Sequence, residues 1–245
     1  MARSRATHLK VLTRCEQKWL YERGAGDDEW NTVATLVGTR VHLRLAEYLK
    51  DGSKPDQQER YLHHPVGLIA DSMIGPWLPP PGKGAVEDPF EMKLEGGHTL
   101  TGTIDWHSSL KGGKAWWIID HKTSSDPEAW GLTVDTLKCD LQHLVYAYSR
   151  VHLFGVQRVL ALWNYGARFR KAPLPGKRVL ISTSADELRI RFQEHVLPLL
   201  SRMDEIDAGS PAKRNYEACN DYNKECPHMD RCLADASAEA DNLIT

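Results

Sequence analysis

The sequence predicts a single α/β domain, and three observations support this prediction. Apolar residues recur at helical spacing in several long segments, such as residues 32–50. Between these segments lie short apolar or alternating runs bounded by glycine pairs, which are typical of strands and turns. The chain has 245 residues, 41% of them hydrophobic, which is enough to bury one sizeable core. We find no internal repeat or low-complexity tract that would divide it.

Helices are expected wherever apolar residues gather on one helical face. The expected segments are residues 8–23, 32–50, 61–77, 136–153 and 186–208. Gly24 begins a glycine-rich break after the first segment, and Asp51–Gly52–Ser53 ends the second. The prolines at 79–81 follow the third segment and require irregular backbone. Helices therefore occupy both ends of the chain and leave its middle for strands.

Strands are expected over residues 90–94, 99–105, 115–120, 159–163 and 179–182. The turn at Gly96–Gly97 joins the first two into a hairpin, and Gly112–Gly113 leads into the third. The third strand is apolar at almost every position, as expected when both faces of a strand are buried. The order of strands and helices favours one α/β domain, with its two ends brought together.

Two neighbouring strands of this predicted sheet each end in an acid. Asp105 ends one, Asp120 ends the next, and Lys122 follows two residues later. Alternation along a strand puts Asp120 and Lys122 on one face, and strand pairing can bring Asp105 beside them. Lys122 cannot satisfy both acids unaided, so a cation is the simpler solution, and paired carboxylates suit Mg²⁺ or Mn²⁺. A nearby ammonium can hold or activate the attacking water and offset charge building on a phosphate.

Polar residues on two predicted helices fall where such a centre needs them. His42 borders the apolar stripe of the helix over 32–50 and can reach a metal from above the sheet. Gln142 and Tyr146 lie one helical turn apart and share a face, from which they can touch a phosphate or a flanking base. Each of these residues is, taken alone, also compatible with an ordinary helix surface or core position.

Four short motifs follow one another in a specific order along the chain. They are G-x-x-x-H at Gly38–His42, G-x-x-D at Gly102–Asp105, D-x-K at Asp120–Lys122 and Q-x-x-x-Y at Gln142–Tyr146. This set, spanning roughly residues 33–150, resembles the RecB-like branch of the PD-(D/E)XK nuclease superfamily, with Ile104 where the superfamily commonly has proline. The resemblance implies a restriction-endonuclease-like core, in which a central mixed β-sheet is flanked by helices.

The resemblance also implies roles for individual residues. It implies that Mg²⁺ or Mn²⁺ is held by His42, Asp105, Asp120 and the backbone carbonyl of His121. Lys122 then serves the nucleophilic water, while Gln142 and Tyr146 contact DNA or orient Lys122. Glu47 and Glu87 lie where relatives often carry acids, and we treat them as secondary candidates.

The cysteines suggest a second metal site. Five cysteines in a chain that is expected to be cytoplasmic favour metal binding or catalysis over disulfides. One precedes the catalytic motifs and three follow them, as in RecB-like nucleases with an iron–sulfur cluster, such as CRISPR-associated, AddB-type and phage-type exonucleases. The resemblance implies a 4Fe–4S staple made by Cys15, Cys219, Cys226 and Cys232. Zinc remains the alternative, with His228 as a substitute ligand, and Cys139 is interpreted as a packed or idle thiol.

The charge pattern leaves room for a nucleic acid partner. The formal net charge is −2, but Arg168, Arg170 and Lys171 lie in a short segment without an acid, which favours contact with DNA phosphates. Solvated surface charge is the alternative for each of them. No apolar run approaches the roughly 20 residues that span a bilayer, and none follows the basic N-terminus. We therefore expect a cytoplasmic protein without a membrane partner.

Together these features predict a Mg²⁺- or Mn²⁺-dependent DNA exonuclease acting on single-stranded or duplex ends. We expect one nuclease domain over residues 1–245, with a core at about 33–208 and a staple from 8–23 and 209–235. The resemblance implies work in recombination, repair or CRISPR-type DNA processing, with a protein of such a system as a candidate partner. The alternatives are a catalytically silent DNA-binding or assembly subunit and, less favoured by the basic segment, a phosphohydrolase acting on other substrates.

Overall fold

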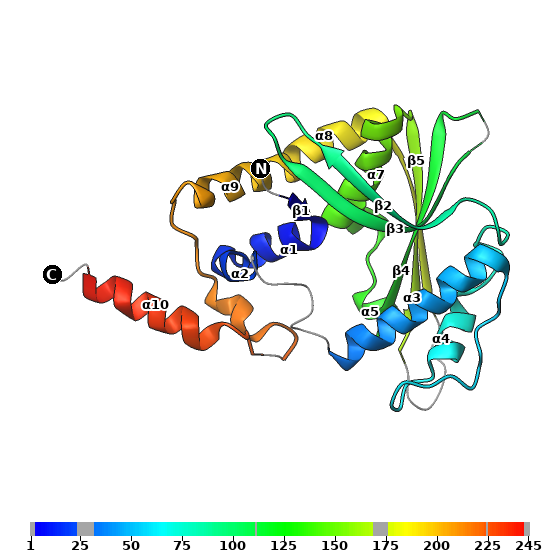
Figure 1. The fold of residues 1–245 in the computed structure, drawn as a ribbon, viewed down its shortest axis with the longest axis horizontal. Coiled ribbons are helices and arrows are strands. Elements are labelled where there is room, and N and C mark those ends of the chain that lie inside the picture. The colour runs from blue at the N-terminus through cyan, green and yellow to red at the C-terminus, as the bar shows by residue number, and fades with distance from the viewer. Residues whose placement is uncertain (1–2, 24–31, 111, 169–175, 224, 243–245) are drawn as a thin grey trace.

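A mixed β-sheet lies at the centre of the molecule (Figure 1). The computed structural model describes residues 3–23, 32–110, 112–168, 176–223 and 225–242. Within these ranges the strands are β1 (Arg3–Arg5), β2 (Ala85–Lys93), β3 (Thr99–Ser109), β4 (Ala115–Ser124), β5 (Arg158–Ala167) and β6 (Lys177–Ser184). Their order is β1-β3-β4-β5-β6, with β2 also paired to β3. The pairs β1–β3 and β4–β5 are parallel and the others antiparallel, so the predicted fold class is confirmed.

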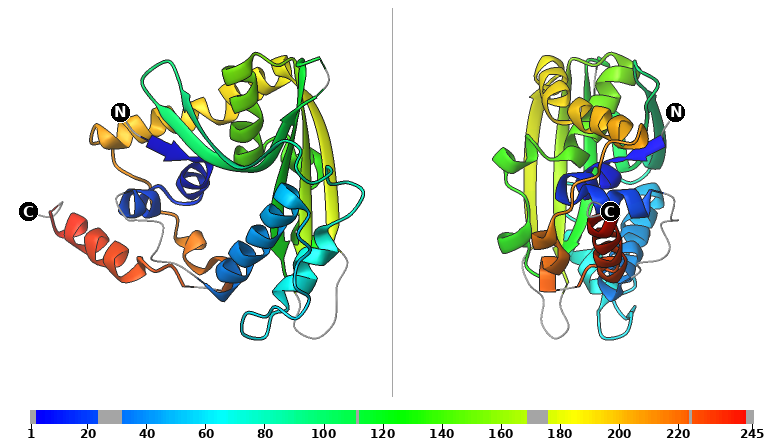
Figure 2. Two further views of the ribbon diagram at one scale, coloured as in Figure 1. Left: turned by 45° about the vertical axis from the view of Figure 1, so that its right-hand side comes forward. Right: turned by 90° about the vertical axis from the view of Figure 1, so that its left-hand side faces the viewer.

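Strand β3 shares one of its edges between two partners. β2 pairs with β3 along almost its whole length, so β1 and β4 both lie against the opposite edge. β1 pairs with Thr99–Thr101, whereas β4 pairs with Trp106–Ser109. The edge of β3 from Gly102 to Asp105 therefore has no strand partner among the described residues. This gap, where the β2–β3 hairpin swings away from β4, positions the candidate site (Figures 1 and 2).

Helices cover both faces of the sheet (Figure 2). On one face α3 (Val33–Asp51) packs with α4 (Val66–Met73), and the buried Ile119 of β4 packs on that side. On the other face α1 (Ala6–Arg14), α7 (Leu141–Phe154), α8 (Ala185–His195) and α9 (Leu197–Asp207) share a larger core with Ile118. Neighbouring residues of β4 thus point into separate cores, as its continuously apolar sequence predicted.

Several predicted helices are interrupted or shorter than expected. The segment 8–23 divides at Cys15, whose backbone is extended, into α1 and α2 (Glu16–Glu22). The segment 186–208 divides at Val196, because Pro198 cannot donate within a continuous helix. The segment 136–153 becomes α6 (Val134–Leu137) and α7, with Asp140 capping α7. Only Val66–Met73 of the segment 61–77 is helical.

The elements that the sequence did not predict are short or terminal. They are β1, α5 (Pro127–Trp130), the 3₁₀ helix η2 (Tyr216–Asn223) and α10 (Met229–Asn242). The chain's two ends nevertheless meet, since Arg202 binds both carboxylate oxygens of Glu16 and the Asn215 amide donates to the carbonyl of Arg14. No helix among the described residues has the length and apolar character needed to cross a bilayer.

Candidate active site

The two predicted acids lie where β3 separates from β4. The ladder between these strands ends at the pair Trp106–Ile119, so Asp105 and Asp120 occupy the next register position. Only 8% of Asp105 and 3% of Asp120 is exposed. Asp105 Oδ2 accepts a hydrogen bond from the backbone N–H of His121 at 2.6 Å. The separation of the strands thus places two buried carboxylates side by side at the end of the paired region.

Helix α3 brings His42 to these acids from the other side. Its Nδ1 lies 3.5 Å from Oδ2 of Asp105. Gly38, one turn earlier, lets α3 approach β4 closely, because a Cβ atom there would lie 3.2 Å from Oγ1 of Thr123. The spacing of glycine and histidine in this motif therefore has a steric reason. The glycine allows a short distance between α3 and β4, and this short distance lets the histidine reach Asp105.

Asp120 is held by two neighbours on the same face of the sheet. Lys122 Nζ lies 2.6 Å from its Oδ2, as alternation along β4 predicted. From α7, the Gln142 amide donates to its Oδ1 at 3.0 Å. Gln142 therefore orients the acid directly and reaches Lys122 only through it. Lys122 also lies 5.1 Å from the centre of the Trp163 ring, a cation–π contact that holds the ammonium over the sheet.

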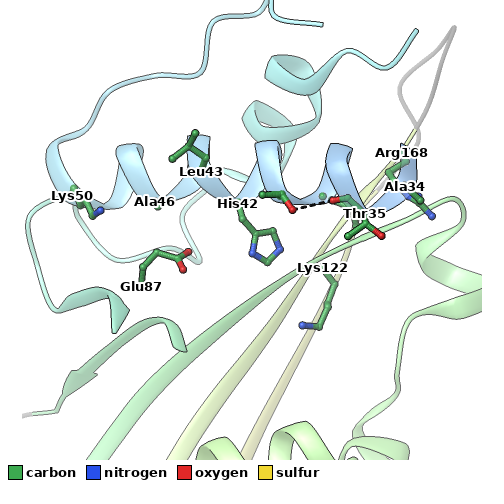
Figure 3. A pocket seen from close by; sticks show the side chains of 12 residues that line it. Ala34, Thr35, His42, Leu43, Ala46, Lys50, Glu87, Lys122 and Arg168 are labelled. Carbon is green, nitrogen blue, oxygen red and sulfur yellow. Dashed lines mark hydrogen bonds between the residues drawn. The ribbon is translucent and has the colours of Figure 1, made fainter. Parts of the chain in front are cut away.

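Glu87 joins the site from β2. Ligand atoms of His42, Glu87 and Asp105 all lie within 4.8 Å of one another. Glu87 has a φ of 52°, a backbone conformation that residues other than glycine rarely adopt. It is absent from the β2–β3 ladder, although Val86 and Asp88 on either side of it are paired. Figure 3 shows Glu87, His42 and Lys122 pointing into the same space. The sequence made Glu87 only a secondary candidate, on its position relative to the family's acids.

Glu47, the other secondary candidate, has a different role in the structure. Its carboxylate binds Arg44 at 2.6 Å on α3. It is not among the grouped residues that can share an ion. His121 is buried, and its ring contacts Asn164 at 3.2 Å and lies edge-on to the ring of His42, while its backbone N–H serves Asp105. A role for the His121 carbonyl stays a prediction.

The charges at the site shift one another's pKa values. Burial alone would raise the pKa of Asp105, but the charge and hydrogen bond of His42 outweigh it and hold that pKa below its usual range. Burial would lower the pKa of His42, and the same contact raises it instead. Burial raises the pKa of Glu87, and the charge of Asp105 adds to this effect. Burial, opposed by Lys122 and reinforced by Asp105, raises the pKa of Asp120 to about 6.

This cluster fits a divalent cation. Asp105 and Glu87 form the group that can share an ion with His42, a histidine that is charged only when protonated. Asp120 lies outside that group, one register position from the last β3–β4 pair, and is bound to the permanent charge of Lys122. Oδ2 of the buried Asp120 accepts no well-aligned hydrogen bond in the described part of the chain, although the Lys122 ammonium lies near it. Carboxylate oxygens with one imidazole nitrogen are donors that suit Mg²⁺ and, still better, Mn²⁺. A bound cation would relieve the repulsion from Asp105 that adds to the effect of burial on the pKa of Asp120 and of Glu87.

Two grooves meet at Lys122, and a third contains Gln142, which binds Asp120. One, of about 690 Å³, is lined by His42, Glu87, Lys122 and Arg168. A second, of about 480 Å³, shares Lys122 with it and continues along the other side of the lysine. A third, of about 900 Å³, is lined by residues of β1, β2 and β3 and contains both Gln142 and Tyr146. The site is therefore accessible from several directions.

The remaining predicted contact residues are only partly described. The Tyr146 ring packs edge-on against Phe90 above Gly102, where a Cβ atom would lie 2.9 Å from the tyrosine ring. Burial and the charge of Asp120 raise the pKa of Tyr146 to about 12, so its hydroxyl stays protonated. Arg168 lines the groove of about 690 Å³ that also contains His42. Arg170 and Lys171 lie outside the described residues.

The four cysteines predicted to form a staple line one small pocket. They come from three places in the chain: Cys15 between α1 and α2, Cys219 in η2, and Cys226 and Cys232 around the start of α10. Burial raises the pKa of Cys219, and the nearness of the other three thiols adds to the effect. His228 also lines this pocket. Cys139 lies apart, exposed and 3.7 Å from Nη1 of Arg191.

The fold and the site together define a restriction-endonuclease-like domain with a carboxylate–lysine centre. The sequence model of the PD-(D/E)XK nuclease superfamily matches residues 68–233, which is more than half of the chain. The chain therefore belongs to the PD-(D/E)XK nuclease superfamily. The match includes Asp105, Asp120 and Lys122, but it begins after His42 and Cys15.

A solved structure has a similar fold. A "putative exonuclease" from Eubacterium rectale is 12% identical, with a TM-score of 0.56 over 91% of this chain and 86% of that chain. The protein SSO0001 is 13% identical, with a TM-score of 0.42 over 88% of this chain and 89% of that chain. No curated protein sequence matches this chain.

Proposed function

We propose that this PD-(D/E)XK protein is a divalent-metal-dependent DNA exonuclease of the RecB-like branch. The observation that carries this proposal is the convergence of His42, Glu87 and Asp105 beside the Asp120–Lys122 pair. The superfamily match supplies the class of reaction, the hydrolysis of phosphodiester bonds. His42, Glu87 and Asp105 would hold the ion. The imidazole nitrogen of His42 favours Mn²⁺ over Mg²⁺.

A divalent cation bound here would offset charge on the phosphate and make a water more acidic. Lys122 supplies a second, permanent positive charge. Burial would lower the pKa of Lys122, but the charges of Asp120 and Asp105 raise it, so the side chain stays an ammonium. It can therefore donate hydrogen bonds to the phosphate or the attacking water, whereas it cannot take a proton from that water.

Asp120 and Gln142 act on Lys122 as positioning residues. Asp120 holds the ammonium at 2.6 Å, and Gln142 fixes the carboxylate through its other oxygen. Exposure of the lysine side chain is 31%, so its tip reaches the groove while its stem is packed. Tyr146, with its hydroxyl kept protonated, donates from the wall of the neighbouring groove. Lys122, Gln142 and Tyr146 thus orient a substrate phosphate without having to change their own charge.

DNA is the proposed substrate because basic residues line the grooves that meet at the site. Arg168 and Lys50 lie in the groove of His42 and Glu87, and Arg3 and Arg5 lie in the groove of Tyr146. Such a distribution attracts a polyanion to a protein whose formal net charge is −2. Contacts by Arg170 and Lys171 remain part of the proposal. A role in recombination, repair or CRISPR-type processing follows from the family resemblance alone.

The four cysteines are proposed to hold a 4Fe–4S cluster that staples the ends of the domain. Four sulfurs around zinc, each about 2.3 Å from the metal, would lie about 3.8 Å apart. Among the described residues, no three of these sulfur atoms lie within 4.8 Å of one another, as the atoms of the His42 group do. The choice of a cluster over zinc rests on the family resemblance, in which one cysteine precedes the catalytic motifs and three follow them. The cluster's chemistry here would be structural, since it lies outside the groove of the acids.

The experiment is the digestion of end-labelled linear DNA, with closed circular DNA as the matched substrate without ends. Purified protein is expected to release labelled nucleotides from linear DNA with Mn²⁺, and not with EDTA. Circular DNA should remain intact. Cleavage of circular DNA at a similar rate would contradict the exonuclease assignment but keep the nuclease. Protein that binds DNA and cuts neither substrate would support the rival function, a silent DNA-binding subunit.

A further inference from the structure

A large aromatic side chain stands exposed in the groove on the far side of Lys122. Trp130 lines the groove of about 480 Å³ that also contains Lys122, and 69% of its surface is exposed. No other residue among the described exposed large hydrophobics is as open to solvent. Water contact with an indole of this size is unfavourable, so its position calls for a reason other than packing.

The loop that presents Trp130 is held firmly. Asp126 caps α5 by accepting hydrogen bonds from two backbone N–H groups, and the N–H of Trp130 binds the Asp126 carbonyl at 3.0 Å. Immediately after it, Lys177 Nζ donates to the carbonyl of Gly131 at 2.9 Å, and the N–H of Leu132 donates to the hydroxyl of Tyr165 at 3.1 Å. The indole is therefore exposed on a preorganised support.

The other residues of this groove combine charge with aromatic surface. Lys10 and Arg14 of α1 line it, together with Trp163 and Tyr165 from β5. Lys10 is held in place by Asp140 at 2.7 Å. Cationic grooves with an exposed aromatic ring are the common solution for binding single-stranded nucleic acid, because every base presents a face to stack on. Bases inside a duplex have no free face for such a ring.

We propose that Trp130 stacks against an unpaired base next to the scissile phosphate, so that this groove binds the single strand entering or leaving the site. The inference rests on the proposed nuclease function, because Lys122 is what connects the groove to the acids. It selects single-stranded ends over blunt duplex ends as the preferred substrate. A protein partner for Trp130 is less favoured, since the groove leads directly to the catalytic lysine.

The test measures binding of fluorescent oligothymidylate by anisotropy, with EDTA present so that no cleavage occurs. W130A is expected to weaken binding about tenfold, and W130F to retain most of the affinity. Blunt duplex DNA should bind both variants and the wild type within about twofold. L180A, which removes another exposed hydrophobic side chain outside the groove, is the matched control and should bind like the wild type.

Oligonucleotides with one abasic position identify the stacking itself. In the wild type, one abasic position should weaken binding as much as W130A does, and in W130A it should cost nothing further. If W130A binds oligothymidylate as tightly as the wild type does, and the wild type still cuts linear DNA, this inference alone is overturned. A change in oligomeric state without a change in affinity would assign Trp130 to a protein contact and overturn it as well. Wild-type protein that neither binds nor cuts DNA would instead overturn the proposed function.

Discussion

Glu87 faces Asp105 across the β2–β3 pair, but its φ of 52° removes it from the ladder and turns its carboxylate towards the same space as His42. A strained backbone at a non-glycine residue persists where the surroundings enforce it, and such residues gather at functional sites. Here the strain adds a third acid to a cluster that already repels negative charge. The relationship links a local backbone feature to the proposed ion.

Glu87 should therefore lower the stability of the metal-free protein and strengthen its binding of metal. E87Q is expected to weaken Mn²⁺ binding about tenfold, because one charged oxygen donor is lost. E87G should weaken it similarly and raise the melting temperature of the metal-free protein, since glycine adopts a positive φ at no steric cost. Calorimetry and thermal unfolding in EDTA measure the two effects. E47Q, in which the lost acid pairs only with Arg44, is the control and should bind Mn²⁺ like the wild type.

Removal of the lysine charge should abolish cleavage without unfolding the chain. K122A is expected to lower the rate of linear DNA digestion at least about a hundredfold, because the charge on the phosphate is no longer offset. D120N should lower it by a similar factor, because the Lys122 ammonium loses the carboxylate that positions it. K138A removes a lysine that pairs with Asp135 on the surface, and it should digest DNA normally. Circular dichroism checks that each variant is folded. Digestion by K122A at the wild-type rate would refute the assignment of that residue.

The raised pKa of Asp120 predicts a pH dependence of stability in the metal-free protein. Its pKa is about 6 in the folded chain and is ordinarily near 4. Between these values the folded chain holds a proton that the unfolded chain has lost. Stability should therefore fall as pH rises through this window, by on the order of 1–3 kcal/mol.

The matched comparison is D120N, which lacks the titrating group. Urea unfolding in EDTA at about pH 5 and about pH 7 should show a smaller loss of stability for D120N than for the wild type. Asp105 does not contribute to the change in stability between these two pH values, because its lowered pKa affects stability only at more acidic pH. Parallel pH profiles for the two proteins would mean that Asp120 has an ordinary pKa in the folded chain.

The cysteine pocket predicts a chromophore that depends on all four thiols. C226S is expected to bleach the visible absorption of anaerobically purified protein and to lower its melting temperature, because a structural metal contributes directly to folding. C139S changes a cysteine outside this pocket and should keep both properties. Zinc in place of iron, measured by elemental analysis, would keep the staple but reject the cluster. An unchanged melting temperature for C226S would contradict the staple itself.

The sequence predicted the sheet and its helices well, for reasons that particular residues make clear. Apolar alternation places Ile118 and Ile119 in different cores, and glycine pairs mark the turns between strands. Helix interruptions were missed at Cys15 and Val196, where apolar periodicity continues although the backbone does not. Periodicity reports which side chains are buried, whereas a break depends on local backbone conformation.

The candidate site was predictable where spacing fixes geometry. The alternation of a strand brings Lys122 to Asp120, and the turn of a helix brings Gln142 to the same acid. The contribution of Glu87 depends on a positive φ, which no residue pattern signals at a glutamate. Trp130 was equally hidden, because an isolated tryptophan in a sequence is usually a core residue. Its exposure becomes visible only in the folded chain.

The most direct test of the account is a calorimetric titration of Mn²⁺ into wild-type protein and D105N. Asp105 belongs to the group that can share an ion with Glu87 and His42, and it also contacts His42 directly, so the proposed ion depends on it. The account predicts saturable Mn²⁺ binding to the wild type and at least about tenfold weaker binding to folded D105N. Equal binding by the two proteins, or no binding to the wild type, would contradict it.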